Sequence, residues 1–204
     1  MLWIKTFFGI LFQTFLLGLF LYLPAFTINW PDASLFLSIH FSITILASCY
    51  LLIFKPSSIE ARMNYDSEAQ PKEDRLATAL MFSAIILGLS LAPIDLFHLN
   101  LSPVFEGVTK NIGLVIYILG MLLVMASMNA NEFAETTVSI QEGRGQKVID
   151  TGIYSLVRHP MYTGFIFFIT GVNLWLGTYL SLLLSLTFLA IALRSRINIE
   201  EKTL

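Results

Sequence analysis

The chain has 204 residues, of which 56% are hydrophobic and only 13% are charged, and its formal net charge is −2. A water-soluble domain usually carries about 25% charged residues, so this composition leaves too little polar surface to cover a soluble globule. The near-neutral charge gives no reason to expect nucleic acid as a partner, and one cysteine, Cys49, cannot form a disulfide framework within the chain.

Long apolar stretches follow one another and predict an all-α integral membrane protein. Spanning segments are expected to be helices, because lipid offers no partner for an open backbone. The first stretch is longer than the roughly 7–15 residues of a signal-peptide core and is not followed by a small-residue cleavage site, so it is interpreted as a span. Four stretches come near the about 20 residues that cross a bilayer: Phe7–Ile28, Leu35–Phe54, Leu76–Phe97 and Ile112–Ala130.

The fifth stretch, Met161–Leu193, is too long for one span and too short for two full spans and a loop. Gly177 lies near its middle. The length therefore predicts a hairpin of two short helices, Tyr162–Leu176 and Leu180–Arg196. The expected fold is four transmembrane helices plus a C-terminal helical hairpin.

The basic residues favour this hairpin. With it, all but one of the 12 lysines and arginines lie at the same membrane face, and the exception is Lys110. The positive-inside rule makes that face cytoplasmic, and it holds the N-terminus. The polar segment Lys55–Arg75 is interpreted as a solvated loop on this side, with room for a short surface helix.

Two polar clusters flank the predicted hairpin. Pro160 suits the first turn of a helix, and it keeps His159 out of helical geometry. Arg158 and His159 therefore lie where free N–H groups of the helix start could bind a carboxylate or phosphate. The alternative is a basic anchor at the membrane edge, with Tyr162 as an interfacial aromatic.

The second cluster is Arg194–Glu201. Arg196 and Glu200 are four residues apart and share a helix face, so the simpler interpretation is a solvated helix end with a surface ion pair. If the hairpin forms, however, Glu200 and Glu201 return beside His159. Basic groups, an aromatic ring and two carboxylates would then suit a zwitterionic ligand that carries hydroxyls.

Other polar residues give weaker indications. His40 is expected to pack within its helix bundle, although an ionisable group inside a membrane can be functional. Asp95 and His98 are expected near the outer interface. Asn131 could cap the fourth span or contact a ligand. The three histidines are scattered and no Cys/His cluster has metal-ligand spacing, so no metal is expected.

Residues 129–204 contain ordered motifs on both sides of the hairpin. This pattern resembles the isoprenylcysteine carboxyl methyltransferase family, and the related phospholipid N-methyltransferases share the Arg-His-Pro-x-Tyr and Glu-Glu elements. Residues 1–128 resemble the family only as generic spans and are interpreted as a scaffold. The motifs are Asn131-x-Phe133, Val138-x-Ile140-Gln141, Arg144-Gly145, Val148, Gly152-x-Tyr154, Val157-Arg158-His159-Pro160-x-Tyr162-x-Gly164 and Arg196-x-x-x-Glu200-Glu201-x-x-Leu204.

The resemblance implies an S-adenosylmethionine-dependent methyltransferase with its cofactor pocket at the cytoplasmic membrane face. It implies that Glu200 and Glu201 bind amino or ribose groups of the cofactor, and that Arg196 orients them or meets the acceptor. Arg196 and Glu200 are thus the residues expected at the reaction centre. Those expected to bind the cofactor are Val148, Gly152, Tyr154, Arg158, His159, Tyr162, Glu200 and Glu201.

The implied acceptor is lipid-like, and the family's suggestion is the carboxylate of a prenylated cysteine. Such a carboxylate is ionised near pH 7 and needs no general base, and methyl transfer needs alignment more than acid or base. The alternatives are a phospholipid or small-thiol methyltransferase, a membrane NADPH-dependent sterol-type reductase, and a non-catalytic scaffold or carrier. Glu200-Glu201 near the end favours a methyltransferase over the reductase.

Two departures accompany the resemblance. Ile153 stands where the family usually has proline, which is expected to loosen the turn before Tyr154. Relatives usually continue beyond the position of Leu204 with a polar, aromatic-containing tail. The expectation is therefore either a shortened version or a more open site. The sequence leaves the oligomeric state open.

Overall fold

The computed structural model describes residues 1–63, 72–131 and 149–203, and the regular elements among them are helices. Five helices there are long and apolar enough to cross a membrane, which confirms the predicted all-α integral membrane fold. These are α1 (Leu2–Ala25), α2 (Pro31–Phe54), α4 (Lys72–Ile94) continued by the π-helical turn η1 (Asp95–Leu99), α5 (Gly107–Ala130) and α7 (Tyr179–Thr203). Shorter elements are α3 (Pro56–Met63), the 3₁₀ turn η3 (Gly152–Ser155) and α6 (Pro160–Leu176).

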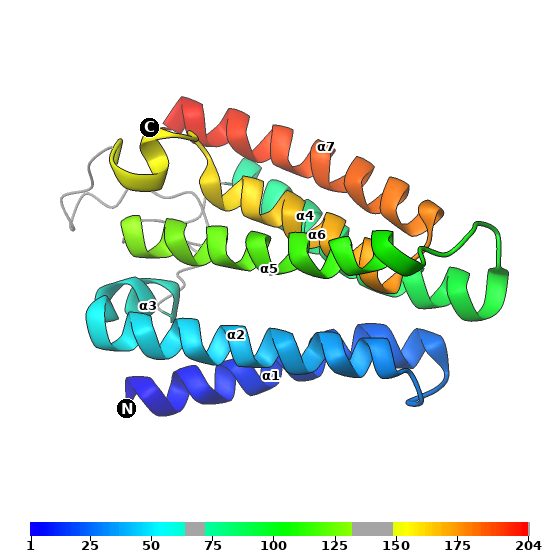
Figure 1. Cartoon of the computed structure of the whole chain (residues 1–204). Coiled ribbons are helices and arrows are strands. Elements are labelled where there is room, and N and C mark those ends of the chain that lie inside the picture. The colour runs from blue at the N-terminus through cyan, green and yellow to red at the C-terminus, as the bar shows by residue number, and fades with distance from the viewer. Residues whose placement is uncertain (64–71, 132–148, 204) are drawn as a thin grey trace.

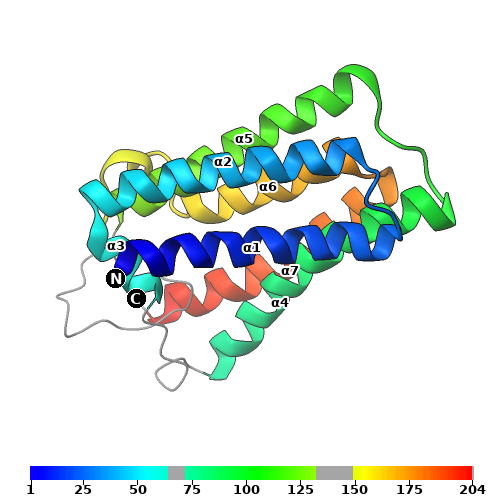
Figure 2. The ribbon, with the colours of Figure 1, turned by 90° about the horizontal axis from the view of Figure 1, so that it is seen from below.

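Helices α1, α2, α4, α5, α6 and α7 lie side by side, and each runs opposite to the one before it in the chain (Figure 1). Both described ends of the chain lie at the same end of the bundle, together with α3 and η3, and we call this the terminal end. Seen from below, α1 and α2 run together, and α4 lies beside α7 (Figure 2). The chain runs out along α6 and returns along α7, so the predicted hairpin is present.

The second limb of the hairpin is longer than predicted. Instead of Leu180–Arg196, α7 covers Tyr179–Thr203, and by length it could cross a membrane alone. The apolar run marks only the part of the helix that crosses the membrane, whereas the backbone stays helical past the charged residues. The start of α6 is as expected, with Pro160 in the first turn and His159 at the N-cap.

Glycines let α5 and α6 pack closely. A Cβ added to Gly171 would lie 2.3 Å from the backbone N of Tyr117, and one added to Gly120 would lie 2.7 Å from the backbone N of Phe168. Such contacts are closer than real Cβ atoms allow, so glycine is required where the two backbones meet. This close seam fixes the direction in which α6 leaves the terminal end.

At the end of the bundle opposite the terminal end, Asp95 connects the loop after η1 with the turn between α6 and α7. This residue is 2% exposed, and it lies near the end of the third span, as the sequence indicates. The carboxylate accepts hydrogen bonds from the Leu101 N–H at 2.7 Å, from Ser102 Oγ at 2.7 Å and from Thr178 Oγ1 at 2.6 Å. Because Thr178 belongs to the hairpin turn, these bonds fix the turn against η1.

His40 lies in the centre of the bundle. Its Nδ1 is 2.8 Å from the Tyr117 hydroxyl, and its ring contacts Phe36 and Phe168 edge-on or tilted. These contacts tie α2 to α5 and α6, which is the packing role predicted for this residue.

Candidate active site

The hairpin brings the two polar clusters together at the terminal end. His159 Nδ1 is 3.7 Å from Glu200 Oε2, and His159 Nε2 is 3.6 Å from Glu201 Oε1. The ring of His159 stacks on that of Tyr162, with 5.5 Å between centroids and an interplanar angle of 19°. One histidine edge thus faces both carboxylates, from the helix start that Pro160 defines.

Tyr162 links the first cluster to the second. Its hydroxyl donates a hydrogen bond of 2.7 Å to Glu200 Oε2 and accepts one of 3.3 Å from Arg196 Nε. We call His159, Tyr162, Arg196, Glu200 and Glu201 the carboxylate cluster. The bond from Tyr162 orients the Glu200 carboxylate, whereas Glu201 is more exposed, at 54% against 28% for Glu200.

Arg196 faces α4 and is 2% exposed. Its Nη1 lies 2.8 Å from Asp74 Oδ1 and also donates to Thr78 Oγ1. The sequence places Asp74 in a solvated loop, but α4 already begins at Lys72, and Asp74 is fully buried. A carboxylate and a hydroxyl one helical turn apart, at the start of an apolar span, mark a polar face on this helix, but they do not indicate which helix it meets.

Three more of the predicted cofactor residues, Gly152, Tyr154 and Arg158, lie on η3 or shortly after it. Burial raises the pKa of the Tyr154 phenol, and the nearby Glu200 charge raises it further, whereas a hydrogen bond with Asn131 and the charge of Arg62 lower it. Gly152 has a positive φ of 61°, which suits glycine. Arg158 is exposed, and Val148 lies outside the described residues.

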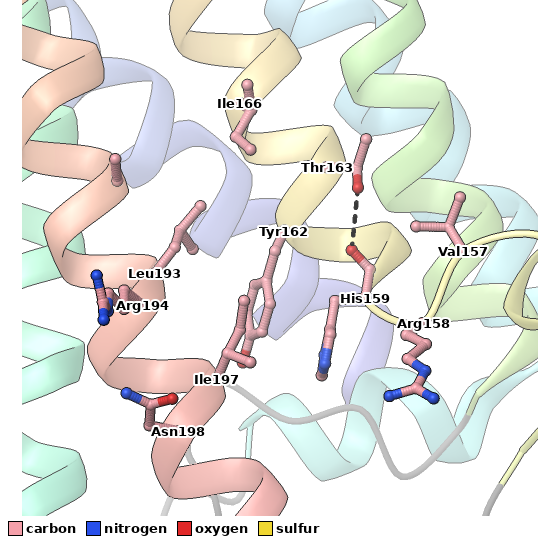
Figure 3. A pocket seen from close by; sticks show the side chains of 11 residues that line it. Val157, Arg158, His159, Tyr162, Thr163, Ile166, Leu193, Arg194, Ile197 and Asn198 are labelled. Carbon is pink, nitrogen blue, oxygen red and sulfur yellow. Dashed lines mark hydrogen bonds between the residues drawn. The ribbon is translucent and has the colours of Figure 1, made fainter.

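An open groove of about 540 Å³ lies between α6 and α7 (Figure 3). We call it the α6–α7 groove. In both overall views the two helices lie further apart at the terminal end than at their shared turn (Figures 1 and 2). Apolar side chains line one part of it: Val157, Ile166, Ala190, Leu193 and Ile197. Polar or charged ones line the rest: Arg158, His159, Tyr162, Thr163, Arg194 and Asn198.

This arrangement combines a polar binding site with an apolar surface. Carboxylates can accept hydrogen bonds from ammonium and hydroxyl groups, and the groove can take an alkyl or prenyl chain. Among the described residues, no group of three or more His, Cys, Asp or Glu side chains could hold a metal ion. The local chemistry therefore suits an amphipathic ligand, a polar cationic ligand, or both together.

The model of one protein family, described as phospholipid methyltransferase, matches residues 108–204. Residues 108–204 are similar to the phospholipid methyltransferases. The matched segment contains α6, α7 and the whole carboxylate cluster, but neither Asp74 nor Thr78. No curated protein and no solved structure matches the chain significantly. The match supports the broader part of the resemblance, to membrane methyltransferases with lipid-like substrates, without selecting the isoprenylcysteine carboxyl methyltransferases.

Proposed function

We propose that this protein is an integral membrane methyltransferase that uses S-adenosylmethionine and acts on a lipid-like acceptor. The observation that carries the proposal is the convergence of His159 and Tyr162 with Glu200 and Glu201, within the segment that matches the phospholipid methyltransferase family. In this proposal residues 129–204 perform the reaction, and residues 1–128 form the scaffold. The terminal end faces the cytoplasm, as the distribution of basic residues indicates.

The cofactor is proposed to bind at the carboxylate cluster. S-adenosylmethionine supplies an electrophilic methyl group on a sulfonium, together with an ammonium group and ribose hydroxyls. Glu200 and Glu201 would hold the ammonium and the hydroxyls, because ionised carboxylates are strong acceptors. His159 and Tyr162 would offer stacked ring surfaces. Further contacts are proposed for Val148, Gly152, Tyr154 and Arg158.

Glu200 and Arg196 have different proposed roles. Glu200 would touch the cofactor, since its side chain is 28% exposed and Tyr162 orients its carboxylate. Arg196 is buried against α4, and its Nε bonds to the Tyr162 hydroxyl, so the geometry favours orientation of Tyr162 and Glu200 over contact with the acceptor. Of the two roles expected from the resemblance, orientation is therefore the one we propose.

The acceptor is proposed to enter the α6–α7 groove from the bilayer. Its chain would lie along Ile166, Ala190 and Leu193, and its head would reach the polar rim beside His159. The carboxylate of a prenylated cysteine is our first candidate, because it arrives ionised and requires no base. A phospholipid amine is the second candidate, and the family match favours it. A small thiol would make little use of the apolar lining.

Calorimetry of the detergent-solubilised protein with S-adenosylhomocysteine, and separately with NADPH, tests the cofactor. We expect binding of S-adenosylhomocysteine only. Binding of NADPH alone would favour the sterol-type reductase, and binding of neither would favour a scaffold or carrier.

Transfer of a labelled methyl group tests the acceptor. The substrates are farnesylated cysteine, the same cysteine without its tail, and phosphatidylethanolamine. We expect transfer to farnesylated cysteine and not to the free amino acid. Transfer only to phosphatidylethanolamine would replace the first candidate with the second, and equal rates on both cysteines would contradict entry from the bilayer.

A further inference from the structure

The ion pair between Asp74 and Arg196 joins the scaffold to the carboxylate cluster. Its N–O distance is 2.8 Å, and the two side chains are 0% and 3% exposed. Asp74 lies on α4, outside the segment 108–204 that matches the family. The charge that holds Arg196 thus comes from the part of the chain that resembles the family only as generic spans.

The position of Arg196 along α7 explains why this partner matters. Residues four apart on a helix are neighbours, so a guanidinium at 196 could pair with a carboxylate at 200. Such a pair would compete with a cationic ligand for Glu200. In the structure, Nη1 of Arg196 is bound to Asp74 and Thr78, and the Glu200 carboxylate accepts a hydrogen bond from the Tyr162 hydroxyl.

We propose that Asp74 is a positioning residue that holds Arg196 against α4, so that the ionised Glu200 carboxylate can bind the ammonium group of the cofactor. This inference rests on the proposed function. Asp74 itself does not touch the cofactor. Its effect passes through Arg196, and the effect of its removal therefore depends on whether Arg196 is present.

This dependence separates a positioning role from a structural one. Removing one partner of a buried ion pair leaves an uncompensated charge, whereas replacing both partners is often close to neutral. In Asp74→Asn, the guanidinium is released toward Glu200. In the double variant Asp74→Asn/Arg196→Gln, there is no charge to release, and the glutamine keeps an N–H donor near Tyr162.

The experiment is calorimetry with S-adenosylhomocysteine on the full-length protein, accompanied by thermal midpoints. We expect Asp74→Asn to bind about tenfold or more weakly, as for loss of a charge-assisted hydrogen bond, and the double variant to bind no more weakly than Arg196→Gln alone. Asp95→Asn is the matched control: it neutralises an equally buried carboxylate at the other end of the bundle, and it should lower the thermal midpoint without weakening binding.

The outcomes separate the two proposals. If the unsubstituted protein binds no S-adenosylhomocysteine, the proposed function is wrong and this role of Asp74 is wrong with it. If the unsubstituted protein binds but Asp74→Asn binds equally well, or the double variant binds more weakly than Arg196→Gln alone, only the role of Asp74 is overturned. Should Asp74→Asn fail to fold, Thr78→Val should show a smaller loss in the same direction, and unchanged affinity would contradict the inference.

Discussion

At the scale of single residues, Glu200 and Glu201 differ in their surroundings. Glu200 is oriented by Tyr162, whereas Glu201 is the more exposed of the two. A charge-assisted hydrogen bond to a ligand is worth about 1.5–3 kcal/mol, or roughly tenfold to a hundredfold in affinity. We predict losses in this range for Glu200→Gln and smaller ones for Glu201→Gln, measured by titration with S-adenosylhomocysteine. Unchanged affinity in both variants would refute the proposed cofactor position.

Tyr162→Phe tests the hydroxyl that links Arg196 to Glu200. The substitution keeps the ring that stacks on His159 and removes both hydrogen bonds of the hydroxyl, of which the one to Glu200 orients the carboxylate. The typical net value of one such bond is about 1 kcal/mol. We predict roughly fivefold weaker cofactor binding with little change in thermal midpoint. Tyr179→Phe, at an exposed tyrosine in the hairpin turn, is the control, and an equal loss in both variants would show that the effect is not specific to the site.

The sequence indicated the approach of His159 to Glu200 but missed the pairing of Arg196 with Asp74. The length of the fifth apolar stretch and the placement of the basic residues predicted a hairpin, and that hairpin brings Glu200 back beside His159. The partner of Arg196 lies on α4, and only the pairing of α4 with α7 brings Asp74 to it. No local periodicity specifies which helices pair.

At the scale of helices, the seam between α5 and α6 determines where the site lies. We predict that Gly171→Ala destabilises the protein by about 1–3 kcal/mol, because its Cβ would meet the backbone of Tyr117 in a packed interface. Gly9→Ala on α1 is the matched control, since nothing lies within 4 Å of its added Cβ. Thermal midpoints in detergent measure both, and equal midpoints would contradict the close packing.

Helix boundaries were less predictable than helix number. Apolar stretches identified the spans, but α2 begins at Pro31 rather than Leu35, and α5 begins at Gly107 rather than Ile112. Hydrophobicity reports contact with lipid, whereas helix ends depend on capping and on loop contacts. Pro31 in the first turn was a usable local signal. The continuation of α7 to Thr203 had no comparable signal in the apolar pattern.

At the scale of the whole molecule, the alternating helices place α3, η3 and the end of α7 at the same end of the bundle. Single cysteines at Arg158→Cys and Asn198→Cys, in a background without Cys49, should therefore be labelled by an impermeant reagent from the same side of the membrane. Our proposal makes that side cytoplasmic. Labelling of the two positions from opposite sides would contradict the hairpin. The sequence predicted this common face from its basic residues, and helix packing now gives it a three-dimensional arrangement.

The unequal limbs of the hairpin have a consequence for the surrounding membrane. With 17 residues, α6 is about 25 Å long, shorter than the about 30 Å thickness of a typical hydrocarbon layer. With both ends at the interfaces, either the bilayer thins beside α6 or His159 is drawn below the level of the lipid headgroups. We therefore predict that methyl transfer in vesicles of defined acyl-chain length is fastest in thin bilayers and falls as the chains lengthen. A rate that is independent of chain length would show that α6 does not adjust to the bilayer.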